Sequence, residues 1–198
     1  MFSDSKLLLK LWLKNPKQIG TVAPSSPELA SAMARHIPPM GKIGEGYVVE
    51  LGGGTGPVTR AILDTGVPPE RLIVVERDAV LHRHLQERYP SVRVLQGDAM
   101  HLQQLLNREG IRPVKCIVSS LPLLSMKKAI QHRIGAQAFA VLEPGAPFIQ
   151  FTYGLFSPLN RRLLGVSGTV EDRVLQNLPP ASVWLYRKGG RHHHAEAA

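Results

Sequence analysis

The chain has 198 residues, which is the usual length of one domain and hardly of two. An apolar fraction of 43% and a charged fraction of 20% exclude disordered and collagen-like proteins, and the single cysteine, Cys116, excludes an internal disulfide. A net charge of +9 predicts a polyanionic partner, either nucleic acid or an anionic membrane surface.

The first 14 residues predict an amphipathic helix. Lys6, Lys10 and Lys14 recur every four residues and share one side of a helix, while leucines and Trp12 cover the rest. These lysines interrupt the apolar stretch that a signal peptide needs, and no apolar run approaches the roughly 20 residues that span a bilayer. We expect the helix to lie on an anionic membrane; the alternative is a helix docked on the protein's own core.

A second helix is predicted to begin near Pro27. Ser25 and Glu28 have the spacing of a capping box, and Pro27 suits a first helical turn. Residues 38–46 are rich in proline and glycine and are expected to form a loop. The predicted organisation is an N-terminal region of residues 1–40, a main domain of 41–190 and a tail of 191–198 with a His triplet.

From residue 47 onward short apolar runs alternate with helical patterns. Strands are predicted at residues 47–51, 72–76, 92–96, 115–119, 148–153, 169–175 and 181–187, and helices at 61–65, 78–88, 102–108 and about 130–141. This alternation predicts an α/β fold, with a mostly parallel seven-stranded sheet and helices on both faces. Because ligands of such sheets bind at the carboxyl ends of the strands, functional residues are expected directly after them.

A glycine-rich loop follows the first predicted strand. Its spacing is Glu-x-Gly-x-Gly-x-Gly, formed by Glu50, Gly52, Gly54 and Gly56. The nicotinamide fingerprint Gly-x-Gly-x-x-Gly fails in both possible frames. The observed spacing resembles the first motif of the Rossmann-like class I S-adenosylmethionine-dependent methyltransferases; the alternative is a plain glycine turn.

Two carboxylates after the next strands agree with this interpretation. Glu76 closes the second strand, where a carboxylate accepts hydrogen bonds from both ribose hydroxyls; the alternative is a surface ion pair with Arg77. Asp98, followed by Ala99, comes after the third strand, where it would accept from the adenine amino group; the alternative is a helix N-cap. Together they predict S-adenosylmethionine as cofactor and S-adenosylhomocysteine as its product.

The turn after the fourth strand reads Ser119-Ser120-Leu121-Pro122-Leu123. Class I methyltransferases that act on amino nitrogens often carry Asn/Asp-(Pro or Leu)-Pro-aromatic here, and the polar side chain and a backbone carbonyl accept from the target nitrogen. Leu123 replaces the aromatic residue, so a nucleobase would lose a stacking contact of roughly 1–3 kcal/mol. The turn therefore argues against an adenine substrate but not against an aliphatic amine; the alternative is an ordinary turn before a helix.

Four segments carry a resemblance to a known family. They are IGTVAPSS at 19–26, VELGGGTGPVT at 49–59, SSLPLL at 119–124 and QFTYG at 150–154. They resemble bacterial phospholipid N-methyltransferases, in particular the soluble phosphatidylethanolamine N-methyltransferases, which are related to ribosomal RNA adenine dimethyltransferases. The resemblance implies methylation of phosphatidylethanolamine to its mono-, di- and up to trimethylated form. It also implies a cytoplasmic protein bound to the inner face of the bacterial plasma membrane.

The predicted substrate site lies after the fourth and fifth strands. Ser119 or Ser120 and the Leu121 carbonyl are expected to hold the amine in line with the methyl group. Tyr153 closes the fifth strand, where its hydroxyl would bond the amine and its ring would hold the methylated cation; the alternative is a tyrosine of the core.

Four further residues complete the predicted site. Arg161 and Arg162 are expected to hold the lipid phosphate, or else are surface charge, and Thr21 and Ser25 to cover the cofactor. Neither a metal, a nucleic acid nor an obligate protein partner is expected. Two alternatives stay open: an RNA adenine methyltransferase, and a membrane-associated protein that binds the cofactor without catalysis.

Overall fold

The computed structural model describes residues 26–153, 156–175 and 180–189. The predictions for Lys6, Lys10, Trp12 and Lys14, and for Thr21 and Ser25, fall outside these residues, as does the tail of 191–198.

A single sheet of seven strands forms the centre of the protein, in the order β3-β2-β1-β4-β5-β7-β6. The strands are β1 (Tyr47–Leu51), β2 (Leu72–Glu76), β3 (Arg93–Gln96), β4 (Val114–Ser119), β5 (Phe148–Thr152), β6 (Val166–Val174) and β7 (Ala181–Lys188). The first five are parallel, and β7 runs antiparallel to both β5 and β6. The α/β fold and the predicted number of strands are confirmed.

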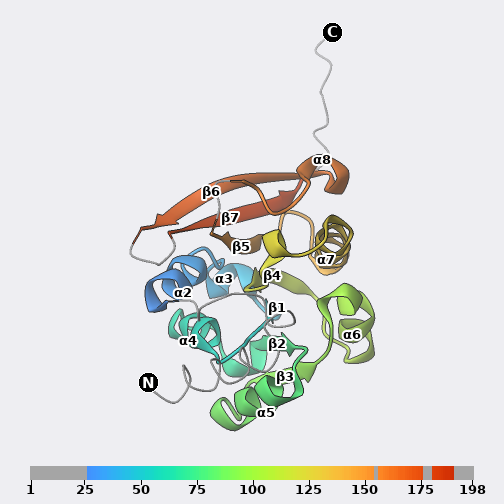
Figure 1. Ribbon diagram of the computed structural model, residues 1–198. Helices are drawn as coiled ribbons and strands as arrows, with labels where there is room; N and C mark the ends of the chain where they lie inside the picture. Colours follow the sequence, from blue (N-terminus) through green and yellow to red (C-terminus); the bar gives the residue numbers. More distant parts are fainter. Residues whose placement is uncertain (1–25, 154–155, 176–179, 190–198) are drawn as a thin grey trace.

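Helices cover both faces of the sheet (Figure 1). One face carries α2 (Pro27–Ala34), α4 (Pro57–Asp64) and α5 (Ala79–Arg88), and the other carries α6 (Leu102–Arg108) and α7 (Lys128–Val141). Short helical turns lie between them: α3 (Met40–Ile43), η1 (Pro69–Arg71), η2 (Ala99–His101), η3 (Leu123–Ser125) and α8 (Arg161–Leu164). Strand residues alternate between the two faces, so each face buries its own apolar cluster.

Three predictions about the N-terminal part need correction. The N-cap of α2 is Ser26, one residue later than predicted, and its side chain accepts from the Leu29 N–H at 3.2 Å. Residues 40–43 of the predicted loop form α3. Leu29 and Met33 of α2 are fully buried in the same cluster as Val48 of β1, so this part of the 1–40 region belongs to the core of the main domain.

Helix α4 begins four residues before its predicted start. Gly56 is its N-cap in the left-handed region, with φ of 90°, and Pro57 occupies the first helical position. Glycine tolerates this φ and proline suits the first turn, so two residues that usually indicate a loop begin a helix here.

The carboxyl ends of the parallel strands meet at one edge of the sheet. The register pairs Leu51 with both Val75 and Ser119, and Ser119 with Gln150. The segments that follow β1, β2, β4 and β5 therefore converge there, where a doubly wound sheet binds its ligands. No helix within the described residues is long and apolar enough to span a bilayer.

Candidate functional site

The glycine loop between β1 and α4 depends on left-handed backbone. Gly52, Gly54 and Gly56 have φ of 77°, 57° and 90°. A Cβ on Gly52 would lie 2.8 Å from the Leu121 side chain, and one on Gly56 would lie 2.6 Å from the Tyr89 ring. A Cβ on Gly54 would meet no atom of the described residues within 4 Å, so within that part of the chain the loop is open to a ligand on that side.

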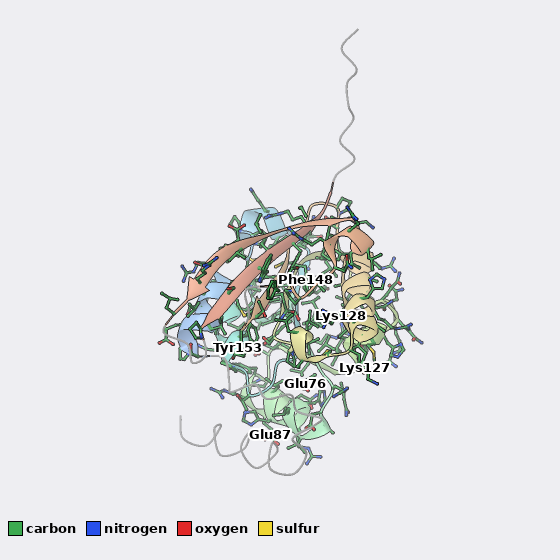
Figure 2. The ribbon with its side chains drawn as sticks, turned by 45° about the horizontal axis from the view of Figure 1, so that its top comes forward. Glu76, Glu87, Lys127, Lys128, Phe148 and Tyr153 are labelled. Atoms are coloured by element: carbon green, nitrogen blue, oxygen red, sulfur yellow. The ribbon has the colours of Figure 1, made fainter. Side chains whose placement is uncertain are left out.

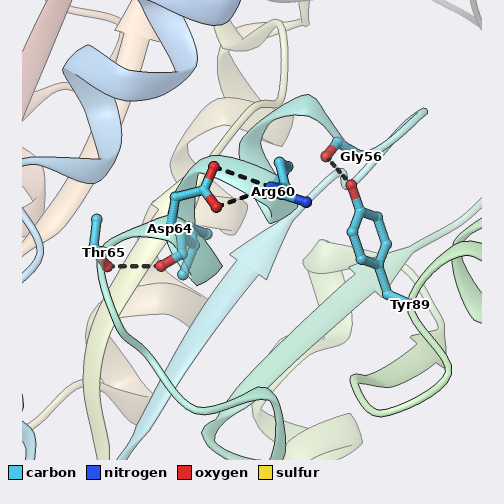
Figure 3. Close-up of polar contacts among 6 residues, drawn as sticks. Gly56, Arg60, Asp64, Thr65 and Tyr89 are labelled. Carbon is cyan, nitrogen blue, oxygen red and sulfur yellow. Dashed lines mark hydrogen bonds and ion pairs between the residues drawn. The ribbon is translucent and has the colours of Figure 1, made fainter. Parts of the chain in front are cut away.

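Helix α5 fixes the far end of this loop. Figure 3 shows the Tyr89 hydroxyl donating to the Gly56 carbonyl at 2.8 Å, beside the Arg60–Asp64 ion pair on α4. Arg88 Nη1 donates to the Thr55 carbonyl at 3.0 Å. Both contacts hold the chain just before α4 against the end of α5.

Glu76 lies against the same loop. Its Oε2 accepts from the Gly54 N–H at 3.0 Å, and its Oε1 accepts from the Asp78 N–H at 2.8 Å. Glu76 is only 7% exposed, and the ion pair of Arg77 among the described residues goes to Asp98, so the surface pair between Glu76 and Arg77 is not formed. A carboxylate oxygen can accept two hydrogen bonds, and each oxygen of Glu76 accepts one here, so each can accept another from a hydroxyl group of a ligand.

Glu50 is fully buried beneath the loop. Its Oε2 accepts from the Thr59 hydroxyl at 2.6 Å, while its Oε1 has no hydrogen-bond partner among the described residues. Burial raises the pKa of the Glu50 carboxyl to about 8, the Thr59 hydrogen bond opposes that shift, and the charge of Glu76 adds to it. Near neutral pH this carboxyl is therefore largely protonated, and a bound cation would favour its ionised form.

Asp98 acts as a cap. Its Oδ1 accepts from the Met100 N–H at 2.8 Å at the start of η2, which is the alternative that the sequence left open. Its Oδ2 lies 3.8 Å from Arg77, and Ala99 is buried beside it. Because Asp98 follows β3 at the carboxyl edge, a role toward an adenine group stays a prediction.

The turn after β4 is held by side chains from two strands. Ser119 Oγ accepts from the Leu121 N–H at 3.4 Å, whereas Ser120 Oγ is buried without a partner among the described residues. Gln150 of β5 is fully buried, and its Nε2 donates to the Leu121 carbonyl at 2.9 Å. The Leu121 side chain in turn packs against Gly52, so this turn and the glycine loop are in direct contact.

Tyr153 follows β5 at the same edge. Its ring packs edge-on against Phe151 at 5.2 Å and joins the apolar cluster on the α2 and α4 side of the sheet. Its hydroxyl is buried, and Figure 2 shows the residue on the same side of the molecule as Glu76. The ring thus belongs to the core, and contact of Tyr153 with an amine stays a prediction.

Arg161 and Arg162 lie at the wrong end of the sheet for their predicted role. Arg161 Nη1 donates to the Gly168 carbonyl at 2.9 Å; Gly168 pairs with Tyr186, and Tyr186 pairs with Phe148, the first residue of β5. The arginines line a surface hollow of about 670 Å³ there. Five residues of strand, roughly 15 Å, separate this end from the carboxyl edge, so they do not hold the phosphate of a lipid whose amine lies beside Tyr153.

Sequence reasoning missed three residues of the site: Thr59, Tyr89 and Gln150. Thr59 lies in α4 and Tyr89 directly follows α5; both fall outside the predicted helices of 61–65 and 78–88, and no pattern singles them out for a role. Gln150 stands between Ile149 and Phe151 in an apolar strand and opens the QFTYG segment that carries the family resemblance; these are the two signals that the sequence offers.

The residues present fit the predicted cofactor. Glu50 Oε1 is buried and has no hydrogen-bond partner among the described residues, and in the ionised form of the carboxyl it suits the ammonium group of a methionine moiety. Among the described residues, Gly54 leaves space beside the Glu76 carboxylate, which suits a ribose. A nucleoside linked to a methionine offers both groups at once.

Comparison with known proteins agrees with this fit. The chain is 36% identical over 190 residues to the ornithine lipid N-methyltransferase of Singulisphaera acidiphila, which covers 93% of this chain and 96% of that protein. It is 34% identical over 89 residues to ribosomal RNA small subunit methyltransferase A of Chlorobium phaeobacteroides, which covers 44% of this chain and 33% of that protein. No family model matches the chain.

Solved structures support the fold. The O-methyltransferase from Bacillus cereus in complex with SAH superimposes with a TM-score of 0.61 at 14% identity, covering 94% of this chain and 91% of that one. Fold and site together define a class I S-adenosylmethionine-dependent methyltransferase. Within this class the chain belongs to the family of the ornithine lipid N-methyltransferase.

Proposed function

We propose that the protein transfers methyl groups from S-adenosylmethionine to the amino nitrogen of a membrane lipid headgroup. The observation that carries the proposal is the 36% identity to a lipid N-methyltransferase over 93% of the chain. The sequence motifs resemble phosphatidylethanolamine N-methyltransferases, whereas this relative acts on an ornithine lipid. Both headgroups offer a primary amine, so a primary aminolipid is the proposed substrate class, with phosphatidylethanolamine and ornithine lipid as the two candidates.

The glycine loop and the ends of β1 to β3 form the proposed cofactor site. Gly52 and Gly54 give a ligand close access to the backbone, Glu76 accepts from ribose hydroxyls, and Glu50 accepts from the methionyl ammonium. Asp98 lies where an adenine amino group would come. When bound there, the cofactor supplies a methyl group on a positively charged sulfur.

The turn after β4 and the end of β5 form the proposed amine site. An alkylammonium group has a pKa near that of lysine, roughly 10, so the substrate must lose a proton before its nitrogen can attack. The turn of residues 119–126 contains no histidine and no carboxylate, which favours proton loss to solvent. The site then contributes by orienting the neutral amine, and Tyr153 would contact the methylated cation.

The charge of the protein supports a membrane surface as its place of action. A net charge of +9 attracts an anionic bilayer, and the 1–14 segment has the composition of an interfacial helix. We propose that the protein binds the cytoplasmic face of the plasma membrane in this way.

A single assay tests the proposal against its rival. Purified protein receives radiolabelled S-adenosylmethionine together with vesicles of phosphatidylethanolamine, vesicles of ornithine lipid, or ribosomal RNA. We expect label in one or both lipids. Label in RNA alone would support the RNA methyltransferase alternative, and label in none of the three would support a non-catalytic binding protein.

A further inference from the structure

Gln150 has an amide whose orientation is fixed by its neighbours. Its Nε2 donates to the Leu121 carbonyl at 2.9 Å and to the Phe151 carbonyl at 2.7 Å, so both amide hydrogens are used. The carbonyl oxygens of Leu121 and Phe151 both lie next to the same atom of the Gln150 amide group. That atom must be the nitrogen, because an amide oxygen in its place would face two acceptors. The Gln150 Oε1 therefore occupies the other position of the amide group.

This contact changes what the Leu121 carbonyl can do. The carbonyl also accepts from the Leu123 N–H at 2.8 Å, so it already receives two hydrogen bonds. A carbonyl oxygen has two lone pairs, and both are engaged. The prediction that this carbonyl receives the substrate amine is therefore not supported by the geometry, and the acceptor must come from elsewhere in the site.

Gln150 Oε1 is the acceptor that the turn leaves over. The whole Gln150 side chain is buried, and its Oε1 has no hydrogen-bond donor among the described residues. Ser120 Oγ, on the same turn, is a second buried oxygen without a partner in the described part of the chain. Buried acceptors are rarely left without a donor, and an amine substrate brings donors to this position.

We propose that Gln150 Oε1 accepts an N–H of the substrate amine and so orients the nitrogen lone pair toward the methyl group; this inference rests on the proposed function. The lone pair forms the new C–N bond while the C–S electron pair leaves with sulfur. The product nitrogen then releases its extra proton to solvent. Gln150 thus acts twice, because its N–H groups fix the Leu121 turn and its oxygen binds the substrate.

A structural alternative involves Trp184 of β7. Trp184 pairs with Gln150 across the β5–β7 register, and its Nε1 is buried without an acceptor among the described residues. If Gln150 Oε1 closes onto this indole N–H, its role is to join two strands and not to bind substrate. The two roles make different demands on the substrate.

The discriminating property is the number of N–H bonds on the neutral amine. A primary amine has two, a monomethylated amine has one, and a dimethylated amine has none. A residue that accepts an N–H therefore matters for the first methylation and not for the third. A residue that only stabilises the fold affects every step equally.

The experiment measures kcat/KM for the aminolipid that the wild type converts and for its mono- and dimethylated forms, in mixed vesicles. Gln150→Met keeps the side-chain volume and removes the acceptor. We expect kcat/KM for the primary amine to fall about 10- to 100-fold, as for a lost buried hydrogen bond, and that for the dimethylated lipid by less than about threefold. Equal loss on all lipids would overturn the inference.

Two matched variants serve as controls. Gln131 is another buried glutamine whose Nε2 donates to a backbone carbonyl, that of Met126, at 2.9 Å, and its Oε1 already accepts from Lys128. Gln131→Met should keep the wild-type ratio of primary to dimethylated rates. Trp184→Phe should keep it as well; a fall in this ratio as large as that in Gln150→Met would show that the selectivity depends on the Gln150–Trp184 contact and would overturn the proposal.

A second variant gives a readout that needs only the primary amine. Gln150→Glu puts a carboxylate where the substrate nitrogen binds, which stabilises the ammonium form and raises its pKa. The acid limb of its pH–rate profile should therefore move to higher pH than in the wild type, and an unmoved limb would contradict the contact. A wild type that labels no aminolipid refutes the proposed function, whereas a wild type that labels one while both Gln150 variants behave as structural changes refutes this inference alone.

Discussion

Among the described carboxyl groups, Glu50 has the pKa that burial raises furthest above its ordinary value. Burial raises its pKa from the ordinary 4.5 to about 8, so the folded protein holds a proton that the unfolded chain releases above about pH 4.5. The stability that this proton contributes is fully present below pH 4.5 and is lost as the pH rises toward 8. The loss amounts to a few kcal/mol by linkage.

Glu50→Gln tests this linkage, because a glutamine stays neutral at every pH. We expect the free energy of unfolding of the cofactor-free wild type to fall between pH 5 and pH 8 by a few kcal/mol more than that of the variant. Urea unfolding at several pH values measures both. Parallel curves would show that Glu50 is not the group responsible.

Glu76 tests the cofactor site at the same scale. Its carboxylate lies against the Gly54 N–H, and we expect Glu76→Ala to weaken S-adenosylmethionine binding by about 1–3 kcal/mol, the scale of charged hydrogen bonds. Glu87→Ala makes the same change of charge on the exposed surface of α5, on the outer part of the helix in Figure 2, and should leave binding unchanged. Isothermal titration calorimetry compares the three proteins. Equal affinity in the wild type and Glu76→Ala would remove Glu76 from the site.

Between elements, the decisive contact joins the glycine loop to the turn after β4. Gly52→Ala combines a left-handed φ of 77° with a Cβ only 2.8 Å from Leu121. Gly66 has a φ of 90°, but its Cβ would meet no atom of the described residues within 4 Å, so Gly66→Ala reports backbone strain alone. Strain costs about 1 kcal/mol at either site, so Gly52→Ala should be less stable than Gly66→Ala and should also lose cofactor affinity.

Thermal unfolding and calorimetry distinguish these two effects. If Gly66→Ala loses as much stability and cofactor affinity as Gly52→Ala, backbone strain alone explains both variants and the contact with Leu121 adds no further effect. A Gly52→Ala protein with normal cofactor affinity would show that the turn after β4 can move without disturbing the cofactor loop.

The elements themselves were largely readable from sequence, because apolar runs and helix periods are local properties. Every strand was predicted within three residues of its observed ends. The start of α4 was not, because Gly56 and Pro57 indicate a loop in isolation and begin a helix only in this backbone conformation. The role of Gln150 was also out of reach, since its partner Leu121 lies 29 residues away. The displacement of Arg161 follows from the return of the chain toward the amino end of β5, which no charge pattern reveals.

At the scale of the whole molecule, the carboxyl and amino ends of the parallel strands carry different kinds of side chain. The carboxyl edge gathers buried carboxyl and amide groups, whereas Arg161 and Arg162 lie at the opposite edge. If the substrate is the proposed aminolipid, its headgroup must reach this carboxyl edge from the bilayer. We therefore propose that the protein docks with that edge toward the membrane.

The segment of residues 1–14 is the proposed docking element. A helix of this length measures about 20 Å, too short to span the hydrocarbon but long enough to lie flat on it. Each lysine near an anionic surface contributes on the order of 1 kcal/mol, which fades as salt shortens the Debye length, while burial of the leucines and Trp12 does not fade. We expect deletion of residues 1–14 to abolish binding to phosphatidylglycerol vesicles and lipid turnover, and to leave S-adenosylmethionine binding mostly intact.

Charge reversal separates this segment from general basicity. Lys6→Glu with Lys10→Glu should weaken vesicle flotation strongly at low salt and less at high salt, where screening has already removed the electrostatic share. Lys42→Glu with Arg83→Glu makes the same change of net charge on exposed residues of the described domain and should have little effect. If both double variants lose flotation equally, the net charge and not the helix attracts the membrane. If the deleted protein still floats with the vesicles, the helix is part of the core and another surface binds the bilayer.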